Sequence, residues 1–338
     1  MKDEHMISIA MDLSQVPDGA VTAERHGMDN GEKCFSAEHL TSRTDGKGRI
    51  EIFRVMPGIE VSFHEYLAES MVFHHKASDH VLEITHCRAG RIGWEMGNGE
   101  AVYLGPGDIC IHSMKSCADS RMRMPLGYFE GASVALDLNE LGRQIPDLLK
   151  DTAFDAGILY ERYCMPGIPV GVPSGAEAQR IFGPLYEKDG PARNSYYKLK
   201  AIELIMYLEE LDPQKSDTLT GYVSQQTETV REIRDLLVSD LSRRFTIEEL
   251  SRKYLMNTST LKSVFKAVYG MPVASYVKEY RMREARRLLV QTEEPVALIA
   301  QKVGYGTQSK FTQAFKESTD MLPTEYRKTY RNFAGGKT

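Results

Sequence analysis

The stretch that decides the fold lies in the last third of the chain and occurs there twice. Residues 250–281 read LSRKYLMNTSTLKSVFKAVYGMPVASYVKEYR, and residues 299–331 read IAQKVGYGTQSKFTQAFKESTDMLPTEYRKTYR. Phe265 and Phe315 are 50 positions apart, whereas the upstream pair Leu250 and Ile299 is 49 positions apart. The second copy therefore has one more residue in the turn that connects its first two helices.

Each copy has the layout of two short helices joined by a turn and followed by another helix. Thr246 and Glu249 have the spacing of a capping box at the start of the first copy, and Gly270 is placed to end its second helix. A long helix of about five turns is predicted after Pro272, and Pro295 suits the first turn of the second copy. Two helix-turn-helix units at a set distance on one chain are typical of a protein that reads two successive turns of DNA.

The predicted outer faces of the two second helices carry Ser, Thr, Gln and Lys, and residues 259–266 and 308–316 contain no acids. Glutamine can pair with adenine in the major groove, and lysine can meet guanine or phosphate. An alternative is a scaffold or protein-binding solenoid of helical hairpins, although two units are few for a solenoid.

Residues 229–334 resemble the DNA-binding domain of the AraC/XylS family of bacterial transcription regulators. The resemblance runs from FTIEELSRKYLMNTSTLKSVFKAVYGMPVASYVKEYRMREARRLL through IAQKVGYGTQSKFTQAFK to LPTEYR. It implies a seven-helix domain in which a long helix joins two helix-turn-helix units that enter adjacent major grooves. It further implies a regulator of promoter DNA, which we expect to be an activator with RNA polymerase as a partner.

Carried over by position, the resemblance assigns DNA contacts to the outer faces of both recognition helices. These residues are Ser259, Lys262, Ser263 and Lys266 in the first unit, and Gln308, Ser309, Lys310, Thr312, Gln313 and Lys316 in the second. Because the second face is richer in amides, we expect the two half-sites to differ. Asp320 stands where the family usually has glycine; aspartate tolerates left-handed backbone, so we expect that turn to survive.

The composition is that of an ordinary globular protein, with 42% hydrophobic and 26% charged residues among 338. The net charge of −5 is unevenly divided. Residues 222–338 contain 20 Lys and Arg against 13 Asp and Glu, a net +7, which leaves 22 against 34, or −12, for residues 1–221. An acidic N-terminal part and a basic C-terminal part indicate that only the C-terminal part binds a polyanion.

Nothing in the sequence predicts export or a membrane partner. No apolar run approaches the roughly 20 residues that cross a bilayer, and the first residues, MKDEHMISIAMDL, have no long apolar core of a signal peptide. The five cysteines form no Cys-x-x-Cys pair and are interpreted as buried or idle thiols. We therefore expect a cytoplasmic protein.

The front of the chain has the texture of a small β-sandwich or barrel. Short runs rich in β-formers and bounded by Gly, Pro or Asn predict strands at 50–56, 59–66, 81–88, 91–96, 100–104, 108–112 and 127–136. Ala89-Gly90 and Gly97-Asn98-Gly99 predict hairpin turns. The texture of residues 50–136 and the Pro-Gly-Asp turn in YLGPGDICIH are similar to the cupin-like barrels that often precede this DNA-binding domain. Such a barrel implies binding of a small-molecule effector or dimerisation.

Helical periodicity follows the strands, at 141–149, 177–186 and, most strongly, 194–211. The last of these is either a helix that pairs two chains in a homodimer or one that packs on its own barrel. The predicted fold class is α+β, with an N-terminal domain over residues 1–212 (barrel at about 50–136, helices at about 139–211) and a linker at 213–228. The all-α DNA-binding domain occupies residues 229–334.

A pocket in the front domain is predicted only as a hypothesis, lined by Glu83, His86, Arg88, Trp94 and Tyr103. Trp94 fits a core position as well as a ligand platform. Metal-binding cupins need a His-x-His, which is missing here, so no metal, cofactor or catalytic residue is predicted and the protein is not expected to be an enzyme. The alternative is a cupin-type metal enzyme with an appended DNA-binding domain.

Overall fold

The computed structural model describes residues 12–27, 34–35, 41–74, 77–95, 99–118, 120–187, 190–213 and 219–334. Contacts divide the chain into two compact units. The front unit spans Met11–Gln225, and the second unit comprises the described residues from Gln226 onward.

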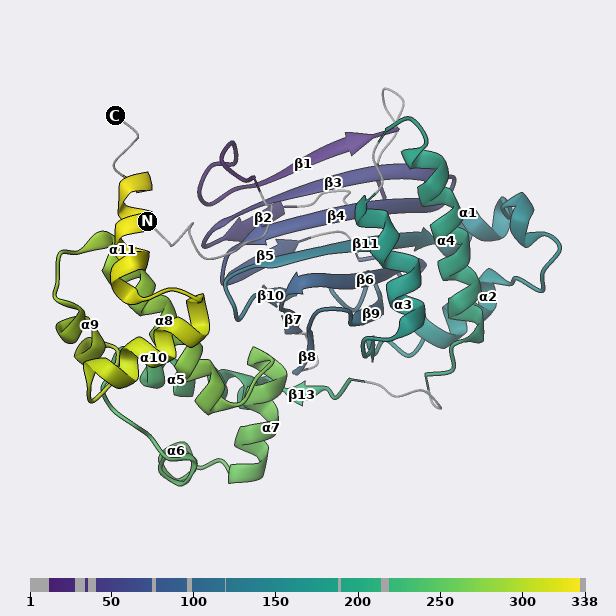
Figure 1. Cartoon of the computed structure of the whole chain (residues 1–338). Helices are drawn as coiled ribbons and strands as arrows, with labels where there is room; N and C mark the ends of the chain where they lie inside the picture. Colours follow the sequence, from purple (N-terminus) through teal and green to yellow (C-terminus); the bar gives the residue numbers. More distant parts are fainter. Residues whose placement is uncertain are drawn as a thin grey trace. The chain divides into compact units, whose positions relative to one another are not determined.

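The front unit is built on two β-sheets (Figure 1). The larger sheet has the order β1-β3-β4-β11-β6-β9-β12, and the smaller has the order β13-β8-β7-β10-β5-β2. The larger sheet contains β1 (Val21–His26), β3 (Lys47–Met56), β4 (Ile59–Leu67), β6 (Val81–Gly90), β9 (Ile109–Ser113), β11 (Phe129–Asp137) and β12 (Val170–Val172). The smaller contains β2 (Thr41–Thr44), β5 (Ser70–His74), β7 (Ile92–Glu95), β8 (Glu100–Leu104), β10 (Arg121–Arg123) and β13 (Tyr222–Val223).

All seven predicted strand regions contain a strand, but their assembly differs from the prediction in two respects. The predicted hairpin at Ala89-Gly90 is wrong, because β6 and β7 belong to different sheets. Gly90 has a left-handed φ of 77°, and a Cβ there would meet the Tyr128 carbonyl oxygen at 2.3 Å, so this glycine turns the chain from one sheet to the other. The second hairpin is confirmed by the pairing of β7 with β8, although its residues 96–98 lie outside the described ones.

A closed cupin-like barrel is not confirmed, since among the described residues no hydrogen-bonded pairing joins the two sheets. The larger sheet ends at β1 and β12, and the smaller at β13 and β2. The observed architecture is therefore a two-sheet arrangement with helices, which keeps the α+β class.

Alternation along the strands of the larger sheet separates two cores. On one face, Val61, Ile84 and Val134 pack with residues of the helices. On the other, Ile52 and Cys87 belong to the core that the larger sheet shares with the smaller one. Because successive side chains of a strand point to opposite faces, one strand contributes to both cores. The helices of this unit are α1 (Leu138–Arg143), α2 (Ala156–Leu159), α3 (Ala176–Phe182) and α4 (Arg193–Glu210), with short 3-10 or π turns at Asp147–Leu149, Tyr160–Cys164 and Gly183–Glu187.

Helix α4 packs on its own sheet through an apolar stripe that includes Tyr197, Leu204 and Leu208 (Figure 1). Tyr197 is 3% exposed, and its ring lies 5.4 Å from that of Phe53 on β3. The stripe is consequently not free to pair with a second chain. Leu199 and Met206 remain exposed on the outer side.

The predicted linker, residues 213–228, is partly structured. Residues 214–218 lie outside the described part of the chain, but the Leu219 amide donates to the Gly171 carbonyl at 2.7 Å. Tyr222 and Val223 then pair with β8, and a helix begins at Ser224.

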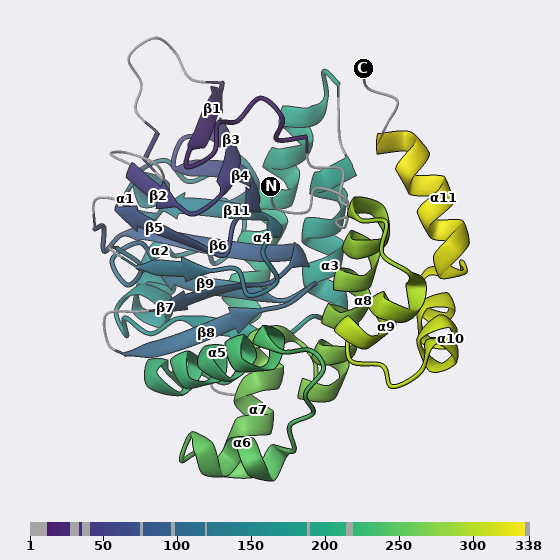
Figure 2. The ribbon, with the colours of Figure 1, turned by 90° about the vertical axis from the view of Figure 1, so that its left-hand side faces the viewer.

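The second unit consists of seven helices in its described residues, in agreement with the expectation from the resemblance. They are α5 (Ser224–Ser239), α6 (Ile247–Lys253), α7 (Thr258–Tyr269), α8 (Val273–Gln291), α9 (Val296–Lys302), α10 (Gln308–Thr319) and α11 (Pro323–Ala334). Figure 2 shows α8 between the pair α6 and α7 and the pair α9 and α10. In no part of the chain that the structure describes is a helix both long and apolar enough to cross a membrane.

Candidate functional site

The two predicted recognition helices, α7 and α10, have the same length of 12 residues and begin 50 positions apart. Phe265 and Phe315 are fully buried beneath them. Each ring meets a tyrosine edge-on: Phe265 lies 5.6 Å from Tyr276, and Phe315 lies 5.3 Å from Tyr326. Equivalent side chains therefore hold both helices in the same way, as the repeat predicted.

Caps set where each helix begins. Thr246 and Glu249 form the predicted capping box at the start of α6. The Asn257 side chain accepts the Thr260 amide at 2.8 Å at the start of α7, and the Thr307 hydroxyl accepts the Lys310 amide at 3.3 Å at the start of α10. These caps satisfy amides that a helix start leaves without a partner, so the first turn of each recognition helix is well defined.

The predicted DNA-contacting side chains lie on the outer faces of these helices. Nine of the ten are exposed and Thr312 is half-buried: Ser259, Lys262, Ser263 and Lys266 on α7, and Gln308, Ser309, Lys310, Thr312, Gln313 and Lys316 on α10. Two of them already have partners. The Ser263 hydroxyl donates to the Thr260 carbonyl at 3.0 Å, and the Gln313 amide donates to Glu317 at 3.1 Å.

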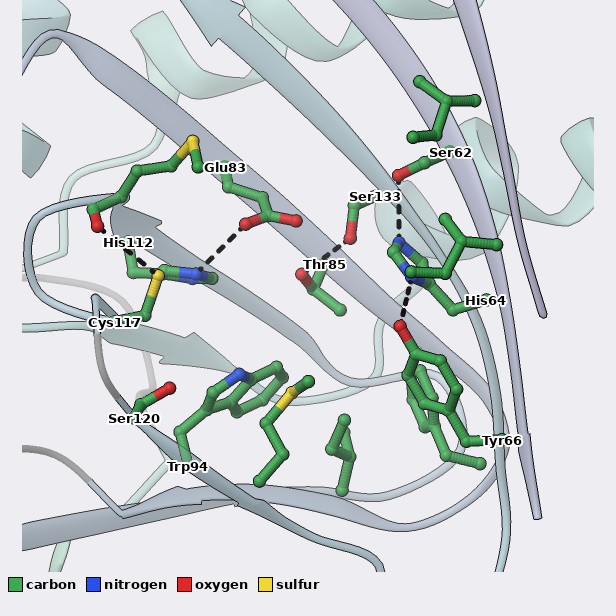
Figure 3. Close-up of a pocket in the computed structure, with 16 residues that line it drawn as sticks. Ser62, His64, Tyr66, Glu83, Thr85, Trp94, His112, Cys117, Ser120 and Ser133 are labelled. Atoms are coloured by element: carbon green, nitrogen blue, oxygen red, sulfur yellow. Dashed lines mark hydrogen bonds and ion pairs between the residues drawn. The ribbon is translucent and has the colours of Figure 1, made fainter. Parts of the chain in front are cut away.

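A cavity lies against the inner face of the larger sheet, with about 700 Å³ of space not filled by atoms, counting its opening to solvent (Figure 3). Its polar wall comes from strands of the larger sheet and from the turn after β9, and its apolar wall is completed by residues of the smaller sheet. The lining residues are Ile50, Ile52, Ser62, His64, Tyr66, Glu83, Thr85, Ile92, Trp94, His112, Met114, Cys117, Ser120, Met122, Phe129 and Ser133.

One end of the cavity carries a chain of neutral hydrogen-bonding groups on β4. His64 Nε2 lies 2.9 Å from the Ser62 hydroxyl, and His64 Nδ1 lies 2.8 Å from the Tyr66 hydroxyl. Burial lowers the pKa of His64 to about 4 against a smaller opposing effect of Glu83, and burial raises the pKa of Tyr66. Both groups are therefore uncharged near neutral pH, and this end can exchange hydrogen bonds with a ligand without ionising.

The other end carries ionisable groups. Glu83 on β6 and His112 on β9 are direct cross-strand neighbours, and Cys117 follows in the turn after β9. One ligand atom from each of the three side chains lies within 4.8 Å of the others. Burial by itself lowers the pKa of His112, but Cys117, Cys110 and Glu83 together outweigh it and hold that pKa well above its ordinary value.

Of the five residues predicted to line a pocket, the structure brings Glu83 and Trp94 into this cavity. His86 faces the helices instead, where its ring stacks on Phe182 at 4.8 Å; burial and, to a lesser extent, Arg88 lower its pKa to about 4. Positions 83 and 86 are three apart, and strand alternation sends them to opposite faces.

Arg88 and Tyr103 also lie away from the cavity. Arg88 pairs with Glu130 at 2.6 Å and lies over the Tyr186 ring, beside a separate hollow on the helix side of the sheet. Tyr103 is buried, and its ring fills the space at Gly93 on the neighbouring strand, where a Cβ would come within 2.4 Å of it.

Sequence reasoning missed most of the cavity wall, including His64, Tyr66, Cys117 and Ser133. The Ser62-x-His64-x-Tyr66 alternation on β4 was a readable signal for one polar strand face. Nothing in the local sequence indicated that β4, β6 and β9 would present their polar faces to the same space.

A family model described as a helix-turn-helix domain matches residues 250–329. The transcriptional activator RhaR of Mannheimia succiniciproducens is 31% identical over 94 residues, which is 28% of this chain and 34% of that protein. The arabinose operon regulatory protein of Escherichia coli K12 is 27% identical over 149 residues, or 44% of this chain and 50% of that protein. These matches span a third to a half of the curated relatives.

Among solved structures, the C-terminal domain of AraT, a response regulator from Geobacillus stearothermophilus, is 31% identical, with a TM-score of 0.29. The match covers 30% of this chain and 84% of that domain. Residues 250–329 therefore carry the helix-turn-helix domain of AraC-type transcription regulators.

Proposed function

We propose that the chain is a sequence-specific DNA-binding transcription regulator in which α7 and α10 contact bases in two successive major grooves of a promoter site. The observation that carries the proposal is the pair of equally built recognition helices, whose exposed faces bear Ser, Thr, Gln and Lys and no acids in their first nine residues. Side chains of these types make direct contacts with base edges and phosphates.

Charge supports the same assignment. Residues 222–338 have a net charge of +7, while the front of the chain is acidic. Neutralising phosphates with Lys and Arg releases counterions from DNA, so the binding constant should fall steeply as the salt concentration rises. A binding constant that did not respond to salt would contradict the electrostatic part of the proposal.

The front unit is proposed to sense a small-molecule effector in the cavity between its sheets. Apolar side chains such as Ile52 and Phe129 line the cavity, and the polar groups of Ser62, His64 and Tyr66 are aligned along one strand. A mainly apolar space with a few convergent polar groups is what small-molecule sites have. An effector that binds one arrangement of the protein better than another changes DNA binding by that difference in affinity.

We infer activation, with RNA polymerase as a partner, because the relative RhaR is named a transcriptional activator. Homodimerisation stays a prediction, and the exposed Leu199 and Met206 on α4 are where we would expect a second chain. The alternative of a cupin-type enzyme gains no support from relatives that are named as regulators.

The DNA-binding proposal is tested by selecting binding sites from random DNA with the full chain and then measuring Kd on the selected site. Lys262→Ala and Gln308→Ala should each weaken binding by about 1–3 kcal/mol without changing the melting temperature. Lys198→Ala removes the same charge from an exposed position of α4 and should leave Kd unchanged. If both recognition-helix variants bind as tightly as the parent chain, the assignment of the reading faces is wrong.

The effector proposal can be tested by tryptophan fluorescence, because Trp94 is the single tryptophan of the chain and lines the cavity. A compound that enters the cavity should change the tryptophan fluorescence and raise the melting temperature. Ser133→Leu, which extends an apolar side chain into the cavity wall, should abolish both signals. A hit that keeps its affinity in Ser133→Leu binds elsewhere.

A further inference from the structure

We propose that Glu83, His112 and Cys117 bind a divalent transition metal such as Zn²⁺ at the wall of the front cavity. The inference goes beyond the proposed function, since it requires neither DNA binding nor an organic effector. It also revises the sequence-based expectation of no metal, which depended on the missing His-x-His.

The three side chains come from separate places and converge. The register of β6 and β9 puts Glu83 directly opposite His112, and the turn after β9 brings Cys117 back over the same wall, with its thiol 3.8 Å from the Met114 carbonyl (Figure 3). Their candidate ligand atoms all lie within 4.8 Å of one another. A metal with bonds of about 2.0–2.3 Å would require only small side-chain adjustments to be reached by all three.

The donor set selects the kind of cation. Thiolate and imidazole are ligands of Zn²⁺, Co²⁺ and similar ions, whereas Mg²⁺ and Ca²⁺ prefer oxygen ligands. With Glu83 and Cys117 ionised and His112 neutral, the ligands carry two negative charges and neutralise a divalent ion. Neutralisation matters here because His112 is 2% exposed and Cys117 is 5% exposed, and an unpaired charge would be unfavourable at such depth.

The hydrogen bonding of the buried His112 ring is incomplete. Its Nδ1 has no hydrogen-bond partner among the described residues, and its Nε2 lies 3.5 Å from the Glu83 carboxylate. A charged N–H···O pair is normally about 2.7–2.9 Å long.

Three protein ligands leave a coordination position for a further donor, as in zinc sites that keep one open position. All three ligands line the cavity, so that position faces the space in which we place the effector. A water molecule or a donor atom of a small molecule would complete the coordination. Trp94 borders the site, with its ring 5.8 Å from that of His112.

Cobalt titration of the full chain, stripped of metal by dialysis against a chelator, tests the proposal. Co²⁺ should bind with one ion per chain, give the thiolate-to-cobalt charge-transfer absorption and quench the fluorescence of Trp94, the single tryptophan. Added Zn²⁺ should reverse both signals by displacing Co²⁺.

Three variants locate the site. Cys117→Ser should remove the charge-transfer absorption, and Glu83→Gln, which preserves shape, should weaken Co²⁺ binding at least about tenfold. Cys87→Ser is the matched control, a buried cysteine on β6 whose thiol contacts the Ala89 and Gly90 carbonyls at 3.7 Å and does not line the cavity. Its cobalt binding should equal that of the parent chain.

The proposal is overturned if the parent chain shows no charge-transfer absorption, or if the absorption survives in Cys117→Ser. It is also overturned if Glu83→Gln binds Co²⁺ as tightly as the parent. Should Cys117→Ser fail to fold, Glu83→Gln and the Trp94 quenching decide the question by themselves. DNA binding is measured separately on the selected site, so failure of the metal proposal and failure of the DNA-binding proposal are distinguishable.

Discussion

The turns of the two helix-turn-helix units have the same backbone conformation, but glycine stands at different positions in them. After α6 the Met256 amide donates to the Ser251 carbonyl at 3.2 Å, and after α9 the Tyr305 amide makes the equivalent bond to Ala300 at 2.9 Å. In the first unit the left-handed residue of this turn is Leu255, with φ 51°, and in the second it is Gly304, with φ 82°.

The helices that follow end in the opposite way. Helix α7 ends on Gly270, with φ 79°, whereas α10 ends on Asp320, with φ 57°. Asp320 donates its amide to the Lys316 carbonyl at 2.8 Å, which confirms the expectation that this turn survives without glycine. Each unit therefore has one glycine and one other residue at its two left-handed positions.

Comparison of the two units shows at which left-handed positions glycine is required and at which it is only favourable. At Gly304 a Cβ would lie 2.0 Å from the Leu241 carbonyl oxygen, so no side chain fits. At Leu255 the side chain is 94% exposed, so the position bears the backbone strain but no clash. The same turn is therefore constrained by packing in the second unit and only by its own dihedral angles in the first.

The largest expected effect comes from adding one methyl group at the constrained turn. Gly304→Ala should lower the free energy of unfolding of the DNA-binding unit by about 2–4 kcal/mol, because the clash with Leu241 adds to the left-handed strain. Urea unfolding followed by helical circular dichroism measures the change. Gly306→Ala is the control, since a Cβ there would meet no atom within 4 Å, and its effect should stay near 0.5 kcal/mol. Equal losses in the two variants would refute the distinction.

The next effect concerns which half of the DNA site each unit reads. Lys262→Ala should relax base preference in one half-site and Gln308→Ala in the other, each by about 1–3 kcal/mol, with the halves about 10 base pairs apart. Repeating the site selection with each variant provides the measurement. If either variant relaxes both halves, the units do not read separately.

A smaller gain is expected at the turn of the first unit. Leu255→Gly should raise the free energy of unfolding by about 0.5–1 kcal/mol, because relief of the left-handed strain exceeds the added entropy of the unfolded chain. Leu255→Ala keeps the Cβ and should show no such gain. A stability of Leu255→Gly at or below that of the parent would show that the turn is not strained.

The smallest effect is expected at Asp320. Aspartate adopts left-handed backbone with less strain than leucine, so Asp320→Gly should stabilise the unit by only a few tenths of a kcal/mol. Thermal unfolding in parallel with Leu255→Gly checks the order of the two gains. A larger gain at Asp320 than at Leu255 would reverse our ranking of the two strained positions.

Prediction from sequence succeeded where the deciding contacts are local. The capping box of Thr246 and Glu249 and the left-handed Gly270 involve residues close in the sequence, and each was predicted at its correct position. In the front unit the strands were predicted from β-forming residues, but their pairing was not, as the hairpin at Ala89-Gly90 shows. Strand pairing depends on segments that are distant in the sequence, so no local pattern predicts which sheet a strand joins.

By itself the sequence determined the two helical repeats of the second unit, the capping box at Thr246, the helix end at Gly270 and the polar faces of α7 and α10, because helical hydrogen bonds and caps connect residues within a few positions of each other. Only the tertiary structure decided that Glu83 meets His112 across two strands, that Cys117 returns beside them and that His86 faces away. Sheet register and strand alternation brought those side chains together or apart. The same holds for the requirement at Gly304, which comes from the carbonyl of Leu241, 63 positions earlier in the chain.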